Sequence, residues 1–245
     1  TVDEIEAILE RSGIFPSLRK KGLTDLSVEI EPIEEFGQTL KVCCKYRSRS
    51  GLLAEARLHE ITFQPEEKMQ ESFSHSKPKM LAIDWLMMQN PFANFTPERL
   101  KLPGQGHPGL GQAHKAMKLL HAYCRWQGLA ALVNFPEYFH NAYLYRAYFR
   151  FYNPLREAML TALYRDLRPL ELAEMSWAIE WQCVQEADCG KNFKWFSGIQ
   201  IMPMQQEIKN YFASQWYRKN AETLHTKRKF LLDMEKFRRL WLKNM

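Results

Sequence analysis

The stretch LKLPGQGHPGLGQAHKAM, residues 100–117, decides how the rest of the chain is interpreted. It holds Gly104, Gly106, Gly109 and Gly111, although the whole chain has only 11 glycines. Two interpretations of these glycines stay open. They form either a tight turn that faces solvent or a backbone cradle for the phosphates of a ligand, because glycine accepts positive φ and lets an anion approach the backbone.

The residues that follow, 112–127, have the clearest helical periodicity in the chain. Ala113, Met117 and Cys124 fall on one face, while Lys118 and Arg125 fall on the other. The N-terminus of such a helix carries unpaired amides and a partial positive charge, and both attract anions. An anion site at this helix is therefore physically sound and requires no lysine.

Two better-known phosphate loops do not fit this stretch. GQGHPG, residues 104–109, matches G-x-G-x-x-G, but that fingerprint opens a strand–helix–strand unit and is followed by an acid about 20 residues later. Here a hairpin pattern precedes the glycines, and the next acid is Glu137. A Walker A loop is excluded because Leu110-Gly111 stands where Lys-Ser/Thr is required. A dehydrogenase is thus only a third choice.

Upstream of the glycines, residues 38–64 predict an antiparallel β-hairpin. Apolar residues alternate with polar ones in TLKVCCKYR, residues 39–47, which is the period of a half-buried strand. The return strand, LLAEARLHEITF at 52–63, changes its apolar parity between Leu58 and Ile61. This change predicts a bulge near His59 or Glu60.

Together with the remaining patterns, these elements predict an α+β fold in which helices flank a mixed sheet. We expect residues 1–203 to form one domain and residues 204–245 to form a basic helical extension. The LAALV strand, residues 129–133, is expected to run parallel to a short strand just before Gly104. The other expected elements are helices near 3–11, 80–91, 137–146, 170–182 and from Asn153-Pro154 onward, strands near 149–152 and 197–203, and a mobile polar loop at 64–79.

Composition narrows the class of protein. The net charge of +6 and the pI of about 9.0 fit an anionic ligand or partner without identifying one, so nucleic acid stays open. Five cysteines without a C-x-x-C pair predict reduced thiols and no metal site. The N-terminal TVDEIEAILERSG lacks the apolar core of a signal peptide, and no apolar run approaches the roughly 18 residues of a membrane span. We therefore expect a cytoplasmic protein.

HPGLGQAHKAMKLLHAYCRWQG, residues 107–128, resembles the signature of the GNAT acyltransferases, Gln/Arg-x-x-Gly-x-Gly/Ala at the start of a long helix. Gly109-Leu110-Gly111 fits its Gly-x-Gly core, although Gly106 stands where the family has Gln or Arg. HNAYLYRAYFRF, residues 140–151, resembles the family's pattern of Asn, Ala, Tyr and Phe. The likeness covers roughly residues 38–152. It implies a GNAT-like fold and transfer of an acyl group from acetyl-coenzyme A, or another acyl-coenzyme A, to an amine on a small molecule or protein.

The resemblance also implies roles for single residues. Tyr145, with Tyr143 as the alternative, would protonate the leaving thiolate of coenzyme A, because a phenol is a reasonable acid for a thiolate. Glu60 or His59 would act as the base toward the amine, and a strand amide would polarise the thioester carbonyl. The implied coenzyme contacts are Gly106, His107, Gly109, Leu110, Gly111, Gln112, Ala113 and Asn141.

Each of these side chains also has a purely structural explanation. His107 can be a hydrogen-bonded loop residue, Asn141 an exposed helix residue and Tyr145 a packed aromatic. Tyr145 lies four residues before Phe149, where the family has five. The second functional hypothesis is therefore a scaffold or interaction subunit that kept the fold and lost catalysis.

The end of the chain, KRKFLLDMEKFRRLWLKNM at 227–245, predicts one basic amphipathic helix. This helix either caps the core of the protein or docks a protein partner or an anionic surface. Its expected apolar face consists of Phe230, Leu231, Met234, Phe237, Leu240 and Trp241.

Overall fold

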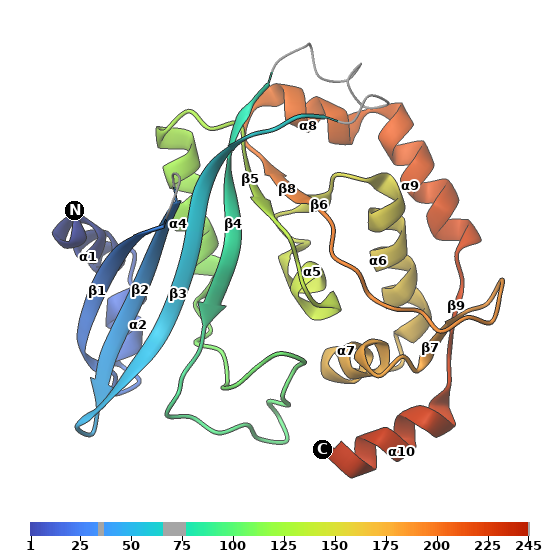
Figure 1. The fold of residues 1–245 in the computed structure, drawn as a ribbon, viewed down its shortest axis with the longest axis horizontal. Coiled ribbons are helices and arrows are strands. Elements are labelled where there is room, and N and C mark those ends of the chain that lie inside the picture. The colour runs from blue at the N-terminus through green and yellow to red at the C-terminus, as the bar shows by residue number, and fades with distance from the viewer. Residues whose placement is uncertain (34–36, 66–76, 245) are drawn as a thin grey trace. The chain divides into compact units, whose positions relative to one another are not determined.

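The computed structural model describes residues 1–33, 37–65 and 77–244, and Figure 1 shows its elements. They belong to two compact units, each described by itself: Thr1–Arg99 with Gln105–Val133, and Leu100–Gly104 with Asn134–Met245. In chain order the elements are α1 (Val2–Arg11), α2 (Ile14–Arg19), β1 (Thr24–Ile33), β2 (Gly37–Tyr46), β3 (Arg49–Thr62), β4 (Lys79–Met88), α4 (Ala113–Trp126), β5 (Ala131–Asn134), α5 (Phe139–Tyr145), β6 (Arg150–Phe151), α6 (Pro154–Leu167), α7 (Leu172–Glu180), β7 (Val184–Glu186), β8 (Gln200–Pro203), α8 (Gln206–Ala213), α9 (Gln215–Lys227), β9 (Phe230–Leu232) and α10 (Met234–Asn244).

Most of the elements expected from sequence are confirmed within a few residues. The helices expected near 3–11, 112–127, 137–146 and 170–182 are α1, α4, α5 and α7. The strands expected near 129–133, 149–152 and 197–203 are β5, β6 and β8. Residues 66–76 of the loop expected at 64–79 lie outside the described residues.

The first unit is built on a sheet with the strand order β1-β2-β3-β4-β5. β1 to β4 are antiparallel neighbours, so the expected hairpin is confirmed as β2 and β3. β5 begins beside the start of β4, where the amide of Ala130 donates to the carbonyl of Lys79 at 2.8 Å. β5 therefore runs in the same direction as β4, and the sheet is mixed, as expected.

β4 corrects one sequence prediction, which made residues 80–91 a helix. Met80, Leu81, Ala82 and Ile83 are all buried, although consecutive residues of a strand point to opposite faces of the sheet. Both faces are therefore covered at this point. A strand that is covered on both faces has a continuous apolar run, and periodicity alone does not distinguish such a run from a short buried helix.

Helices α1 and α2 share a hydrophobic core with one face of β1, β2 and β3. Leu9, Phe15 and Leu18 from the helices pack with Val42 and Leu53 from the strands. Burying a side chain of this size is worth roughly 1.5–3 kcal/mol, so this cluster contributes a large share of the unit's stability.

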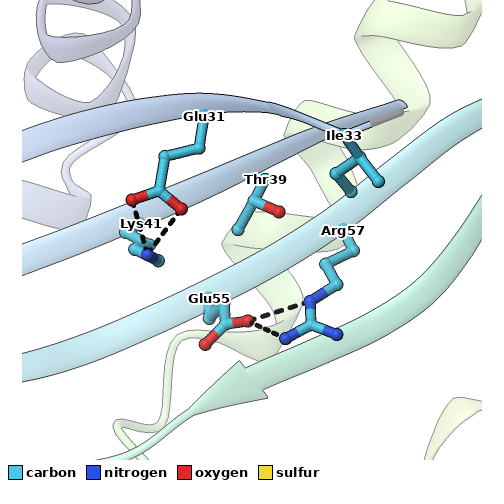
Figure 2. A pocket seen from close by; sticks show the side chains of 6 residues that line it. All are labelled: Glu31, Ile33, Thr39, Lys41, Glu55 and Arg57. Carbon is cyan, nitrogen blue, oxygen red and sulfur yellow. Dashed lines mark hydrogen bonds and ion pairs between the residues drawn. The ribbon is translucent and has the colours of Figure 1, made fainter. Parts of the chain in front are cut away.

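The opposite face of these strands is polar (Figure 2). The ammonium of Lys41 lies 2.7 Å from the carboxylate of Glu31, and the guanidinium of Arg57 lies 2.8 Å from that of Glu55. Because side chains alternate along a strand, Val42 faces the core while its neighbour Lys41 faces this polar side. A hollow of about 280 Å³ on this face is lined by Glu31, Ile33, Thr39, Lys41, Glu55 and Arg57.

A bulge occurs near the expected position, but on a different strand. Arg57 pairs with Trp85 and Leu58 pairs with Ile83, so Asp84 of β4 is an extra residue opposite β3. The prediction had placed the bulge at His59 or Glu60 of β3 itself. It was wrong about the strand because the partner, β4, had been assigned as a helix.

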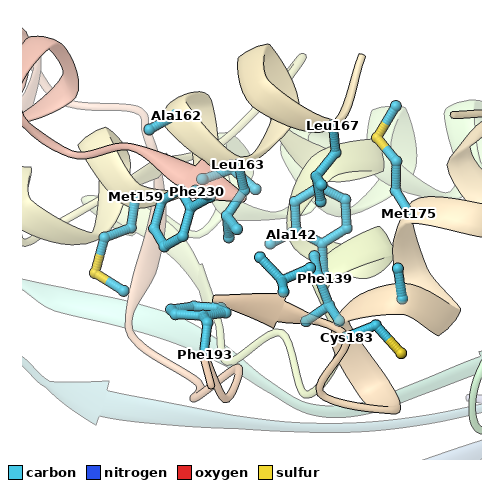
Figure 3. Close-up of a cluster of buried hydrophobic side chains, with 14 of the residues drawn as sticks. Phe139, Ala142, Met159, Ala162, Leu163, Leu167, Met175, Cys183, Phe193 and Phe230 are labelled. Carbon is cyan, nitrogen blue, oxygen red and sulfur yellow. The ribbon is translucent and has the colours of Figure 1, made fainter. Parts of the chain in front are cut away.

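The second unit has its own hydrophobic core, which Figure 3 shows. Phe139 of α5, Leu163 of α6 and Met175 of α7 meet Phe193 and Phe230 in this core. Helix α6 starts at Asn153-Pro154, as expected, and the side chain of Asn153 accepts from the amide of Leu155 at 2.8 Å. The strand pairs β6–β8 and β7–β9 are antiparallel.

The single helix expected at the end of the chain is divided. Phe230 and Leu231 lie on β9, and only the residues from Met234 onward form α10. This part of the prediction was wrong because Phe230 pairs with Glu186 of β7 instead of continuing a helical face. Phe237 is buried against the core of the second unit, as the capping alternative expects.

Candidate functional site

β4 is joined to the glycine loop by an excursion of the chain that returns to the end of the strand. The amide of Asn90 donates to the carbonyl of Pro108 at 2.7 Å, and the amide of Leu110 donates to the carbonyl of Met88 at 3.3 Å. The loop and α4 therefore begin at the carboxyl end of β4. This is the edge at which open sheets flanked by helices commonly bind ligands.

Gly104 has a different role from the later glycines. A short strand was expected just before it, but residues 100–104 belong to the second unit and lie in none of the strands. Gly104 has φ +75°, and a Cβ there would lie 2.6 Å from the ring of Tyr138. Backbone conformation and close packing explain this glycine, so at this position the turn interpretation holds.

The N-terminus of α4 is formed by Leu110, Gly111 and Gln112. Leu110 is buried, whereas Gly111 is exposed with φ +71°. Gln112 occupies the N-cap position without a capping bond from its side chain, whose Nε2 instead donates to the Oγ of Ser17 at 2.9 Å. Within the described residues, the buried Oε1 of Gln112 has no hydrogen-bond partner.

Two lysines bring positive charge to this helix N-terminus. The Nζ of Lys21 donates to the carbonyl of Leu110 at 2.5 Å and lies 3.8 Å from the position that a Cβ of Gly111 would take. Lys115, in the first turn of α4, donates to the carbonyl of Gly13 at 2.6 Å. The first turn, all of which the structure describes, contains no acidic residue. Positive charge therefore accumulates where the helix dipole is already positive.

Helix α1 shows the opposite arrangement. Its first turn carries Asp3 and Glu4, and Thr1 caps it by accepting from the amide of Glu4. Acidic side chains thus lie at the positive end of the helix dipole in α1, whereas lysines lie there in α4.

The predicted coenzyme contacts from Gly106 to Ala113 lie together in the first unit. Gly106 and Ala113 are exposed, and His107 is half-buried. The carbonyl of Gly109 accepts from the guanidinium of Arg99, which fixes the loop just before Leu110. The loop thus presents exposed backbone on either side of an anchored centre.

Tyr145 and Asn141, the other predicted contacts, lie on α5 of the second unit. Burial raises the pKa of Tyr145, so its phenol stays protonated at neutral pH. The hydroxyl of Tyr143 accepts from Arg146 at 2.9 Å, and its ring lies 4.6 Å from that of Tyr164. Tyr143 is therefore already engaged inside its own unit.

Glu60 and His59, the predicted candidates for the base, point to opposite faces of the sheet. Ala54 packs against the core shared with α1 and α2, and by strand alternation Glu60 lies on that same face. His59 lies on the polar face, where its Nδ1 is 2.5 Å from the Oδ2 of Asp84. Only His59 shares this face with the hollow beside Arg57.

Sequence analysis missed Asp84, Lys21 and Lys115 as members of a site. Asp84 was hidden because its strand had been assigned as a helix. Lys21 contacts a residue 89 positions away and Lys115 one 102 positions away. Contacts this distant follow from the packing of α2 against α4, which no local pattern encodes.

The described residues, 1–33, 37–65 and 77–244, contain no group of three His, Cys, Asp or Glu side chains that could hold a metal ion. In the same ranges, none of the helices is both long and apolar enough to cross a membrane. The five cysteines are free thiols, and burial raises the pKa of Cys124 to about 11. Cys124 therefore stays protonated and packs as a small hydrophobic side chain, as expected.

Comparison with protein-family models finds no match to the chain. The curated proteins likewise include no match. Among solved structures, one described as the crystal structure of AtaTR bound with AcCoA is similar to 60% of this chain and 73% of its own, at 14% identity and a TM-score of 0.29. A TM-score of 0.29 is too low to establish a shared fold, so the function of the site is inferred from its residues.

Proposed function

We propose that the protein is a coenzyme A-dependent N-acyltransferase and that the N-terminus of α4 holds the pyrophosphate of an acyl-coenzyme A. The observation that carries this proposal is the positive charge at that terminus, where Lys21 and Lys115 lie at the positive end of the helix dipole. A cation placed there costs roughly 0.3–1 kcal/mol. A bound pyrophosphate would remove that cost and would accept hydrogen bonds from the loop amides.

The glycine positions suit this ligand. Gly111 is exposed and left-handed, so its backbone is accessible to an anion beside the ammonium of Lys21. In the proposal, pyrophosphate contacts the amides from Gly109 to Ala113. Gly106, His107 and Asn141 remain predicted coenzyme contacts, on the strength of the resemblance alone.

The end of β4 offers a place for the pantetheine arm and the thioester. β5 stops at Asn134 after four residues, whereas β4 continues to Met88 and then reaches the loop. The last residues of β4 therefore extend past the shorter parallel strand. In the proposal, an extended ligand lies along this part of β4, up to Met88, whose carbonyl already accepts from Leu110. The bulge at Asp84 lies in this segment, and a bulge takes its extra residue out of the regular ladder. In the proposal, an amide of this segment polarises the thioester carbonyl.

The proposed reaction is direct transfer. The lone pair of a neutral amine attacks the thioester carbon, a C–N bond forms, the C–S bond breaks and the thiolate of coenzyme A leaves. One proton leaves the amine nitrogen, and one reaches the sulfur. Tyr145 remains the predicted donor of that proton on the strength of the resemblance alone. The acceptor is an amine on a small molecule or a protein.

Release of free thiol from acetyl-coenzyme A, measured with a panel of amines, tests this function. The proposal expects amine-dependent thiol release that saturates with acetyl-coenzyme A. Saturable binding of acetyl-coenzyme A without release for any amine would favour the alternative, a scaffold that has lost catalysis. Absence of both binding and release would reject the coenzyme site itself.

A further inference from the structure

His59 and Asp84 form a contact that the proposed function leaves unused. The Nδ1 of His59 lies 2.5 Å from the Oδ2 of Asp84, and the two residues come from the neighbouring strands β3 and β4. The exposed fractions of the two side chains are 34% and 42%, so both are accessible to a substrate. An imidazole that donates Nδ1–H to a carboxylate keeps its Nε2 lone pair available as a base.

The bulge of β4 brings this pair to the segment proposed for the thioester. Trp85 pairs with Arg57, and Ala82 pairs with His59. Paired residues point to the same side of a sheet, so Trp85 and Ala82 face the polar side with Arg57 and His59. Asp84 is the extra residue between these registers, and its carboxylate meets His59 on that same side. The backbone proposed to polarise the carbonyl and the carboxylate that orients His59 therefore belong to one segment of β4.

Two ion pairs lie on the same face of the sheet as His59 and Asp84. Arg57 of β3 is bound to Glu55 at 2.8 Å, and Lys41 of β2 is bound to Glu31 of β1 at 2.7 Å. These four side chains line the hollow of about 280 Å³, and Arg57 lies two residues from His59 on the same face of β3. Figure 2 shows the side chains that line this hollow, among them Glu55 and Arg57 of β3, the strand that also carries His59.

We infer that His59 is the base of the proposed acyl transfer and that Asp84 is its positioning residue. This inference rests on the proposed function and names the group that it lacked. As the amine nitrogen forms its bond to the thioester carbon, the proton on nitrogen passes to Nε2 of His59. Asp84 stabilises the imidazolium, and the electron pair of the broken C–S bond leaves with the sulfur of coenzyme A.

Three variants test the role of His59 by thiol release and by calorimetry with acetyl-coenzyme A. His59→Gln should lower kcat roughly 10²-fold and leave the affinity for acetyl-coenzyme A unchanged. Asp84→Asn, which keeps a partner but removes its charge, should lower kcat with little change in KM for the amine. His121→Gln, on α4 and outside the proposed machinery, is the matched control and should behave as the wild type.

Two further readouts separate a base from a structural residue. The rate of the wild type should rise with pH through one ionisation, and this limb should disappear in His59→Gln. Free imidazole should restore turnover to His59→Ala, because the side chain it replaces is partly exposed. Thermal melts and coenzyme affinity report whether each variant is folded.

The outcomes distinguish this inference from the function on which it rests. A wild type that transfers acyl groups, with a His59→Gln variant that is equally active, overturns the role of His59 alone. Loss of transfer in Glu60→Gln with full activity in His59→Gln would assign the base to Glu60 instead. A wild type that neither binds acetyl-coenzyme A nor releases thiol overturns the proposed function and this inference together.

Discussion

The Nζ of Lys21 lies 2.5 Å from the carbonyl oxygen of Leu110, which joins the end of α2 to the N-terminus of α4. A backbone carbonyl can accept this bond, but it does not neutralise the ammonium charge. The charge therefore remains beside Gly111, where the helix dipole is positive and where we propose that the coenzyme pyrophosphate binds.

Lys21→Gln should weaken acetyl-coenzyme A binding about tenfold, which is about 1.4 kcal/mol, because it removes one positive charge from the pyrophosphate site. Lys118→Gln is the matched control, since Lys118 is exposed further along α4. Calorimetric titration of both variants measures the difference. Equal affinities in the two variants would remove Lys21 from the site.

Gly111→Val should reduce the affinity for acetyl-coenzyme A by more than tenfold, because valine at φ +71° strains the loop and covers the backbone that faces the anion. Gly128→Val is a close control. Gly128 follows the other end of α4 with φ +68°, so it brings a similar backbone strain without touching the proposed site. If both variants lose affinity equally, strain and not loss of the anion site is the cause.

The sequence was sufficient to predict the elements with strong periodicity. α4 and the β2–β3 hairpin have one buried and one exposed face, so their apolar residues recur with the period of a helix or strand. The glycines before α4 marked the loop correctly, and Gly111 does adopt positive φ. These features depend on residues close together in the chain.

The features that sequence missed depend on distant contacts. β4 is buried on both faces around Met80–Ile83, and such a run has no period from which to identify a strand. Asp84 becomes part of a candidate site only through the register of β4 against β3. Phe230 left its expected helix because β9 pairs with β7, a strand more than forty positions earlier. Pairing partners decide these cases, and local propensity does not encode them.

His140 should make the second unit less stable in mild acid. It is buried, with 3% of its surface exposed, and burial lowers its pKa from 6.5 to about 4. The unfolded chain therefore binds a proton in a pH range where the folded chain does not. Protonation of His140 therefore does not lower the free energy of unfolding above about pH 6.5. As the pH falls from there toward 4, it lowers the free energy of unfolding by up to about 3 kcal/mol.

Unfolding free energies measured between pH 4 and pH 7 check this prediction. His140→Gln should flatten the pH dependence over that interval, whereas His121→Gln on α4 should keep the slope of the wild type. Identical slopes in His140→Gln and the wild type would show that His140 does not carry the effect.

Tyr145→Phe separates a proton donor from a packed aromatic. Its ring contacts Phe149, with centroids 6.1 Å apart, and phenylalanine keeps this contact. If Tyr145 is the acid, the transfer rate should fall roughly 10²-fold while coenzyme affinity stays the same. Tyr123→Phe, at an exposed position of α4, is the control for loss of a hydroxyl. Full activity in Tyr145→Phe, with loss in Tyr143→Phe, would move the role to Tyr143.

Calorimetric titration of the full chain with acetyl-coenzyme A tests the central claim most directly. The proposal predicts saturable binding at one site, with a dissociation constant between about 1 μM and about 1 mM, and a much weaker signal for the double variant Lys21→Gln, Lys115→Gln. Thermal melts should show that this variant is folded, since the bonds that the structure describes for these lysines, outside residues 34–36 and 66–76, run to backbone carbonyls. A wild type that does not saturate, or a double variant that binds as tightly as the wild type, would contradict a coenzyme site at the start of α4.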